Sequence, residues 1–393
     1  MTQPNAVDAA HVKKSKLPRR DWILLPVLAV ATILLLLSAS EVVGGYMFTS
    51  SMTGSCMVFD DPTTGARGVP NSTCWQKGRE SHLAEYKFDS CGHRAGLECG
   101  PKRPGTYRIV MVGSSLSFGM LIPEDKSIAA ILPEELSRKT GRRVEVYNAS
   151  IMEFGHLRTF DLQMNEVLAA QPDLILFVLA PSDIRAADYL MPDLQKLESD
   201  DRSLLRKVID LFTSESPARL GGRHFTTFVT ALHFLYQSQS LYVKASLRDD
   251  DSTGFMKTDP TESWRNSSQQ SDFYITNINN QARSAGVPVA ASLIPSRAQA
   301  AMISMREWPP GYDPFKLDRE LRTAFTRNGA TYIDVLPDYE TVPNPEQGYF
   351  PVDGHPNEEG DAVIASFLAK ELTGGAIPAL RATSQEAPSR GEP

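Results

Sequence analysis

The sequence predicts an α/β protein in which a parallel β-sheet lies between two layers of helices, preceded by one membrane-spanning helix. Three observations support this fold class. Short apolar segments alternate with helical segments from residue 106 onward, an uncharged apolar run lies near the N-terminus, and the overall composition is that of a folded protein. Of the 393 residues, 41% are apolar and 22% are charged, which excludes a disordered or fibrous chain.

The strands are predicted from short apolar segments that are rich in β-branched residues. The segment DLILFVLAPSD is almost continuously apolar, as is typical of a central strand in a parallel sheet. The alternation of such segments with helices implies a parallel sheet covered on both faces. The predicted strands are 106–113, 142–150, 173–183, 287–295 and 330–337. The clearest predicted helices are 126–141, 159–171 and 357–372.

An insertion of about residues 186–270 interrupts this alternation between the third and fourth strands. It contains two predicted helical stretches, 203–212 and 224–247. The second has an apolar face that we expect to pack on the sheet domain, or alternatively to form a lid or wall of a substrate site. The remaining domain spans 106–372, and residues 373–393 are predicted to be a flexible tail. The apolar face consists of Phe225, Phe228, Val229, Leu232, Leu235 and Tyr236.

The N-terminus has the features of a membrane anchor. Residues 1–21 are polar and basic, and residues 22–40 are uncharged and would span about 28 Å as a helix, close to the ~30 Å of a bilayer core. The next basic residue is Arg67, so residues 1–21 are expected in the cytoplasm and the body outside it, in the periplasm or the exterior. The alternative is a signal peptide cleaved near Ser38–Ser40, which would also export the body.

The charge of the chain argues against nucleic acid as a partner. The formal net charge is −7, and the body is more acidic still, because the first 20 residues carry five Lys/Arg and a single Asp. A nucleic-acid-binding protein needs a basic surface to neutralise phosphates. The acidic body therefore predicts no nucleic-acid partner.

The four cysteines are confined to residues 41–105, the lead-in between the anchor and the first strand. An even number of cysteines in an exported segment predicts two disulfides, for which three connectivities exist. We favour the nearest-neighbour connectivity, Cys56–Cys74 and Cys91–Cys99. A zinc site is the alternative, although the sequence has no CxxC pair.

Two loops carry residues suited to nucleophilic catalysis. GSSLSFG at 113–119 directly follows the first predicted strand, where open α/β sheets bind ligands and where the first N–H groups of a helix can stabilise an oxyanion. VDGHPNEEG at 352–360 places Asp353 two residues before His355, a spacing suited to a general base and the acid that orients it. The alternatives are an ordinary strand–helix turn at the first loop and, at the second, a helix cap at Asn357 beside an exposed His355.

Four blocks of sequence together resemble those of the SGNH (GDSL-type) serine hydrolases. The first family block, GDSxxxG, matches residues 113–119, and the last block, an Asp before His-Pro and a helix, matches residues 353–356. The middle blocks correspond to NASIMEFG at 148–155 and APSDI at 180–184. The resemblance covers about residues 106–372 apart from the insertion, and it implies a flavodoxin-like three-layer sandwich.

The resemblance implies a role for each matching residue. Ser115 is expected to be the nucleophile, His355 the general base and acid, and Asp353 the residue that orients His355. The oxyanion hole would consist of the N–H groups of Ser115 and Ser150 and the hydroxyl of Ser182. No metal or organic cofactor is implied.

Several positions depart from the family pattern. Ser114, Ser150 and Ser182 stand where the family has Asp, Gly and Asn, respectively. Asn148 and Asp183 are expected to fix the loops rather than to react. The acid lies two residues before the histidine, where three is the commoner spacing. The two-residue spacing resembles membrane-anchored, exported members that handle acyl groups on polysaccharides.

These features predict an exported, membrane-tethered serine esterase that cleaves or transfers O-acyl groups, above all acetyl groups on a carbohydrate. An O-acylated small molecule or polysaccharide is the expected substrate, and a membrane-bound acyltransferase is a conceivable partner. One alternative is a non-catalytic glycan-binding or scaffold module, in which the serine replacements mark a decayed site. Another is a lipid esterase or lysophospholipase, which an exposed apolar face on the insertion would favour.

Overall fold

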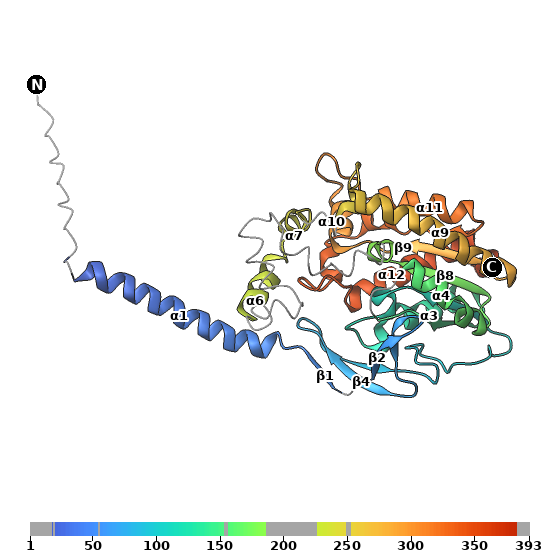
Figure 1. Ribbon diagram of the computed structural model, residues 1–393, viewed down its shortest axis with the longest axis horizontal. Coiled ribbons are helices and arrows are strands. Elements are labelled where there is room, and N and C mark those ends of the chain that lie inside the picture. Colours follow the sequence, from blue (N-terminus) through green and yellow to red (C-terminus); the bar gives the residue numbers. More distant parts are fainter. Residues whose placement is uncertain are drawn as a thin grey trace, which may run out of the picture.

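The computed structural model describes the N-terminal helix and most of the chain that follows it (Figure 1). The predicted helix at 203–212, Phe225 and residues 383–393 of the predicted tail lie outside the described residues. The described residues are 18, 20–53, 56–152, 156–185, 226–248 and 253–382.

A five-stranded parallel sheet forms the centre of the protein, in the order β10-β9-β8-β6-β7. Its strands are buried on both faces, as their continuous apolar sequences predict, and Ile109, Leu176 and Phe177 are fully inaccessible to solvent. The α/β fold with a parallel sheet is therefore confirmed. The strands are β6 (Tyr107–Val112), β7 (Val144–Asn148), β8 (Leu174–Leu179), β9 (Val289–Leu293) and β10 (Thr331–Tyr332).

Helices cover both faces of the sheet (Figure 1). On one face α3 packs against α12, and on the other α4 packs against α9, which also contacts α11. This division follows from right-handed crossovers, because the chain moves outward from β6 to β7 and then returns past β6 to β8. The helices are α3 (Ile128–Thr140), α4 (Leu157–Ala169), α9 (Glu262–Ser284), α10 (Arg297–Met305), α11 (Lys316–Arg327) and α12 (Glu358–Glu371).

The predicted elements differ from the observed ones mainly at their ends. The strand predicted at 173–183 ends at Leu179, shortly before Pro181, which has no N–H to donate to a neighbouring strand. The strand predicted at 330–337 is reduced to two residues, and a 3₁₀ helix follows at Leu336–Thr341. The domain also packs beyond residue 372, because Leu380 within the predicted tail is fully buried.

The lead-in forms two small antiparallel sheets of its own, β1-β4-β5 and β2-β3. Its cysteines form the two predicted disulfides, Cys56–Cys74 and Cys91–Cys99, with Cα–Cα distances of 5.9 and 5.8 Å. The disulfides join parts of the lead-in to one another, and a small buried cluster around Tyr86, which includes Phe118 and Met152, packs these strands against the sheet domain. The strands are β1 (Ser51–Thr53), β2 (Met57–Asp61), β3 (Gly65–Gly68), β4 (Thr73–Lys77) and β5 (Leu83–Lys87).

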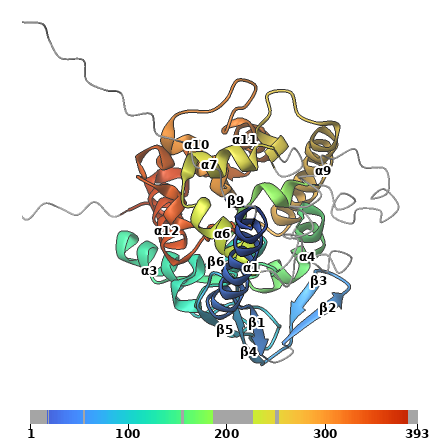
Figure 2. The ribbon, with the colours of Figure 1, turned by 90° about the vertical axis from the view of Figure 1, so that its left-hand side faces the viewer.

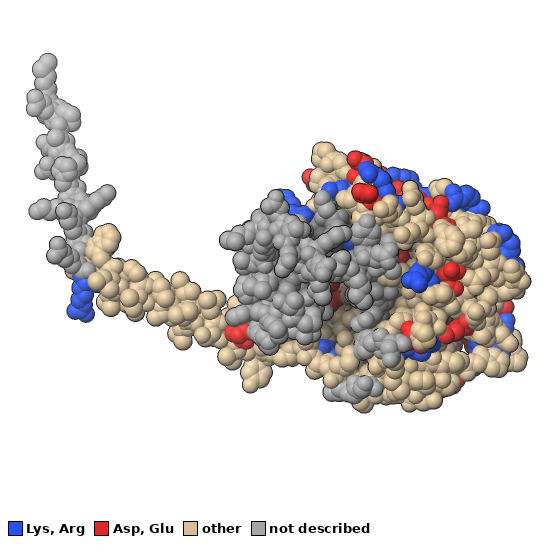
Figure 3. Space-filling view, viewed as in Figure 1, with Lys and Arg blue, Asp and Glu red and all other residues tan. Residues whose placement is uncertain are grey.

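Helix α1 (Asp21–Met47) is long and apolar enough to cross a membrane, and its 18-residue apolar window is entirely unburied. Figure 3 shows an uncharged surface along most of its length. The helix is longer than the predicted 22–40 segment, and its last turns contact α6 (Thr226–Leu235). Together with the disulfides, this helix indicates a chain that enters an oxidising compartment.

The helical stretch predicted at 224–247 is divided into α6 and α7 (Gln239–Ser246). Helix α6 packs against α1 rather than against the sheet. The Glu41 carboxylate accepts hydrogen bonds from the N–H groups of Thr226 and Thr227, at 2.7 and 2.9 Å, and thereby satisfies the free donors at the start of α6. On the predicted apolar face Val229 is buried, but Leu235 is 53% exposed.

Candidate active site

The candidate site lies at the topological switch point of the sheet, where the strand order reverses. Strands β6 and β8 are neighbours, but the chain leaves β6 toward one edge of the sheet and β8 toward the other. Ligands of open α/β sheets bind beyond the carboxyl ends of the strands at such a point. Ser115 follows β6, and Ser182 follows β8 in the 3₁₀ helix Pro181–Ile184.

Ser115 begins the short helix α2 (Ser115–Phe118) at the end of a tight turn. Gly113 permits this turn, because a Cβ atom there would lie 2.3 Å from the Val178 carbonyl oxygen of β8. As the first residue of α2, Ser115 has a backbone N–H without a partner inside the helix. The turn therefore presents a hydroxyl and a donor N–H at the same edge of the sheet.

The loop before α12 brings His355 to Ser115. His355 Nε2 lies 2.8 Å from Ser115 Oγ, and His355 Nδ1 lies 2.6 Å from Asp353 Oδ1. Gly354, with φ of +86°, makes the turn between the two, and Asn357 caps α12 by accepting from Glu359 and Gly360. The helix cap at Asn357 and the contacts of His355 with Ser115 and Asp353 thus occur together. The three side chains Ser115, His355 and Asp353 are arranged as in a Ser–His–Asp triad.

The interaction between Asp353 and His355 favours the ionised form of the Asp353 carboxyl. Burial raises the pKa of the Asp353 carboxyl, but the hydrogen bonds and charge of His355 outweigh this effect, and the net pKa lies below the usual value. Asp353 Oδ1 also accepts the His355 backbone N–H at 3.1 Å. An ionised Asp353 therefore fixes the proton of His355 on Nδ1 and leaves Nε2 free to accept the Ser115 proton.

The two other expected oxyanion donors are placed differently. Ser182 is exposed at the carboxyl edge of the sheet. The Ser150 N–H donates to Asn148 Oδ1 at 3.1 Å, and the buried Ser150 Oγ has no partner among the described residues. The participation of Ser150 and Ser182 in an oxyanion hole stays a prediction.

Asp183 is fully buried behind Ser182. One of its carboxylate oxygens accepts the Ala180 N–H at 2.8 Å. Burial raises the pKa of Asp183 to about 7, even though the hydrogen bond from the Ala180 N–H and the nearby Ser114 and Ser182 hydroxyls lower it. Ser114, which stands where the family has Asp, therefore lies against this carboxyl, and Asp183 fixes the loop as expected.

The structure also places residues at the site that the sequence analysis missed. Glu80, in the turn between β4 and β5, accepts hydrogen bonds from the N–H groups of Val352 and Asp353 at 2.8 and 2.9 Å. The other Glu80 oxygen lies 2.6 Å from His233 Nδ1 of α6. The loop of Asp353 is thus held from the lead-in.

Two buried arginines support the same loops. Arg94 of the lead-in donates to the carbonyls of Gly119 and Ile122, just after α2, and its guanidinium lies 4.4 Å from the Tyr86 ring. Arg297, at the start of α10, donates to the carbonyls of Pro351 and Tyr236. No sequence motif marks these residues, since their partners are backbone carbonyls far away in the sequence.

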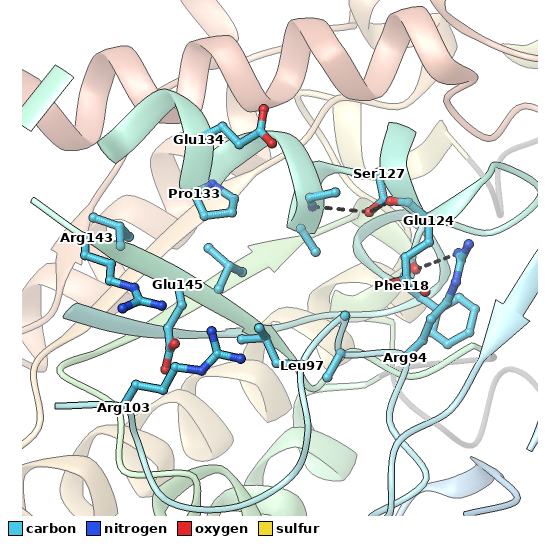
Figure 4. Close-up of a pocket in the computed structure, with 16 residues that line it drawn as sticks. Arg94, Leu97, Arg103, Phe118, Glu124, Ser127, Pro133, Glu134, Arg143 and Glu145 are labelled. Carbon is cyan, nitrogen blue, oxygen red and sulfur yellow. Dashed lines mark hydrogen bonds between the residues drawn. The ribbon is translucent and has the colours of Figure 1, made fainter. Parts of the chain in front are cut away.

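A cavity of about 300 Å³ lies between the lead-in, α3 and β7, and Figure 4 shows its lining. Arg94 and Phe118 are on one side, and Arg103, Arg143 and Glu145 are on the other. None of the triad residues lines it. Among the residues that the structure describes, no group of three or more His, Cys, Asp or Glu is arranged to hold a metal ion.

No family model matches the sequence, and no curated protein matches it. Solved structures similar to this chain include TesA (14% identity, TM-score 0.37, covering 68% of this chain and 98% of TesA). They also include the esterase EstA from Pseudoalteromonas sp. (11% identity, TM-score 0.36, covering 67% of this chain and 96% of EstA). A third is the acetyl xylan esterase AlAXEase (11% identity, TM-score 0.36, covering 66% of this chain and 97% of AlAXEase). Others are described as SGNH hydrolases or GDSL-like lipases.

Proposed function

We propose that the protein is an SGNH-type serine esterase, held at a membrane by α1, with its body on the exported side. The observation that carries this proposal is the chain of hydrogen bonds from Ser115 through His355 to Asp353 at the switch point of the sheet. The four sequence blocks that resemble the family lie on the elements that form this edge of the sheet.

The geometry supports acyl transfer through a covalent intermediate. Ser115 Oγ attacks the ester carbonyl carbon while His355 Nε2 takes its proton, and the carbonyl oxygen becomes an oxyanion near the Ser115 N–H. The C–O bond to the alcohol then breaks, and His355 returns the proton to the leaving oxygen. Water, activated by His355, hydrolyses the acyl-Ser115. A sugar hydroxyl in place of water would make the same site an acyltransferase.

An O-acetylated carbohydrate is the proposed substrate. The support is the two-residue spacing of Asp353 and His355, which resembles exported members that act on polysaccharides. The anchor is proposed to be retained, because the uncharged apolar run of residues 22–40 is longer than the roughly 7–15 residues of a typical signal-peptide apolar region.

A specific observation favours a lipid ester as a second candidate substrate. Phe234 and Leu235 at the end of α6, and Leu241 in α7, are 58%, 53% and 48% exposed. Exposed apolar side chains beside an active site suit an acyl chain or a lipid surface. Hydrolysis of acetylated oligosaccharides and of a lysophospholipid by the same preparation, compared as kcat/KM, distinguishes the two substrates.

The experiment that tests the function is labelling with a fluorophosphonate probe and hydrolysis of a small acetyl ester. The wild-type protein should be labelled and Ser115→Ala should not, and both Ser115→Ala and His355→Ala should lose about 10⁴-fold or more in kcat. The double variant should be little worse than either single variant, because the triad acts as a unit. Full hydrolysis by a folded Ser115→Ala protein would refute the proposal.

Ser117→Ala is the matched control for Ser115→Ala. Ser117 lies in the same helix α2, but its hydroxyl donates to the Ser114 carbonyl and is buried away from His355. Its labelling should match that of the wild type. Equal loss of labelling in both variants would show damage to the helix rather than loss of the nucleophile.

A further inference from the structure

We infer that Glu80 is a positioning residue for the triad: its carboxylate, supplied by the disulfide-linked lead-in, holds the loop that carries Asp353 and His355. The inference deepens the proposed function and rests on it for its kinetic part. It concerns a residue 273 positions before Asp353 in the sequence, outside all four blocks that resemble the hydrolase family.

The first support is the geometry of the hydrogen bonds. A single oxygen, Glu80 Oε2, accepts both the Val352 N–H at 2.8 Å and the Asp353 N–H at 2.9 Å. Hydrogen bonds from N–H groups to an ionised carboxylate are roughly twice as strong as neutral ones. These two bonds hold the two peptide groups on either side of Val352, so the backbone that leads into Asp353 is fixed.

The second support is the burial of the group and its remaining partner. The Glu80 side chain is 2% exposed, so its ionised form must be compensated within the protein. Its other oxygen lies 2.6 Å from His233 Nδ1, which donates a hydrogen bond from α6. Both oxygens of Glu80 are therefore engaged, one with the triad loop and one with the insertion.

The third support is the rigidity of the turn that carries Glu80. The Gly78 N–H donates to Ser81 Oγ at 2.8 Å, and Ser81 Oγ donates to the His82 carbonyl at 3.0 Å. Ser81 itself is 5% exposed. A turn closed in this way gives Glu80 a fixed position relative to β4 and β5. Its carboxylate can therefore hold the loop of Asp353 and His355 in one position.

The consequence is that three segments distant in sequence, the turn of Glu80, helix α6 and the loop of Asp353, together determine how Asp353 lies relative to His355. Asp353 must lie 2.6 Å from Nδ1 for His355 to accept the Ser115 proton at Nε2. A displacement of about 1 Å in a catalytic group can cost on the order of 100-fold in rate. The lead-in and α6 thereby act on turnover without touching the substrate.

The test uses the full-length protein in detergent with the Glu80→Ala and Glu80→Gln variants. Glu80→Ala removes the acceptor and should lower kcat about ten- to 100-fold, with KM changed by less than about three-fold. Glu80→Gln keeps an oxygen for both N–H groups and an amide toward His233, and should retain at least about half of the wild-type kcat. The control is Glu85→Ala, an exposed glutamate on β5 of the same sheet, which should behave as the wild type.

Hydrogen exchange in the 349–356 segment gives a readout that does not depend on the reaction. Glu80→Ala should speed exchange of the Val352 and Asp353 amides by about tenfold or more, and Glu85→Ala should not. Where Glu80→Ala does not fold, Glu80→Asp serves instead, since it shortens the side chain and should also lower kcat. Unchanged exchange, wild-type kcat, or equal losses in Glu80→Ala and Glu80→Gln would overturn the inference. A fully active Ser115→Ala protein would refute the proposed function alone, and the exchange result would still decide the role of Glu80.

Discussion

Ser182 is the residue at which this site differs most from the hydrolases that it resembles. A hydroxyl at this position reaches less far toward a developing oxyanion than the amide of an asparagine. Losing a full oxyanion donor typically costs ~10²–10³ in turnover. We therefore expect Ser182→Ala to lower kcat by roughly ten- to 100-fold with KM little changed, and Ser182→Asn to keep or raise kcat. If Ser182→Ala changes only the melting temperature, Ser182 merely caps the loop.

The buried Asp183 predicts a measurable dependence of stability on pH. Burial raises its pKa to about 7 in the folded protein, against roughly 3.9 in the unfolded chain. The folded state therefore holds this proton between about pH 4 and pH 7, and the free energy of unfolding decreases as the pH rises through that window. The contribution is at most about 4 kcal/mol and is complete above pH 7.

Asp183→Asn should remove this contribution, because an asparagine oxygen can still accept the Ala180 N–H but does not titrate. The free energy of unfolding of the variant relative to the wild type should rise with pH from about 4 to 7 and then level off. Urea unfolding of both proteins in detergent between pH 4.5 and 8 measures the difference. A difference that stays constant with pH would show that Asp183 titrates normally.

At the residue scale, the sequence identified the groups with distinctive chemistry and not those that hold them. Ser115, Asp353 and His355 stand in short motifs whose spacing reflects local geometry, and the structure brings them together. Glu80 and Arg297 stand in no motif, because they bind backbone N–H and carbonyl groups that every residue has. Only the fold determines which backbone groups they meet, so no local pattern could have predicted them.

At the scale of elements, apolar periodicity located each strand of the parallel sheet, since burial on both faces leaves an unbroken apolar run. It could not locate the break between α6 and α7. The stretch 224–247 has helical spacing throughout, but the Tyr236 carbonyl is held by Arg297 of α10. That tertiary bond competes with helix continuation, and the next helix begins only at Gln239.

The lead-in illustrates the same limit. The sequence predicted a lead-in joined by two disulfides but located none of its strands, and the cysteine pairing is confirmed. The five short strands have few residues each, and they are connected by the Cys56–Cys74 disulfide and by the buried cluster around Tyr86. Strands of this length are specified by their neighbours more than by their own sequence.

At the scale of the whole molecule, helix α1 and the triad belong to one continuous set of contacts. Figure 2 looks at the side from which α1 extends. Glu41 of α1 bonds to the start of α6, the Phe48 ring lies 5.0 Å from the His233 ring at the end of α6, and His233 bonds to Glu80. The triad is therefore linked by contacts through Glu80 and α6 to the last turns of α1.

The orientation of the chain in the membrane is the last prediction. Five Lys/Arg lie in the first 20 residues and the next basic residue after α1 is Arg67, so the N-terminus should stay in the cytoplasm and the body should cross. A C-terminal alkaline phosphatase fusion should be active, and the same fusion lacking residues 22–40 should not. In the intact fusion the four cysteines should resist alkylation until a reductant is added, because both disulfides form only in an oxidising compartment. A C-terminal reporter that works solely in the cytoplasm, with four alkylatable thiols, would show the opposite orientation and would remove the basis for an exported esterase.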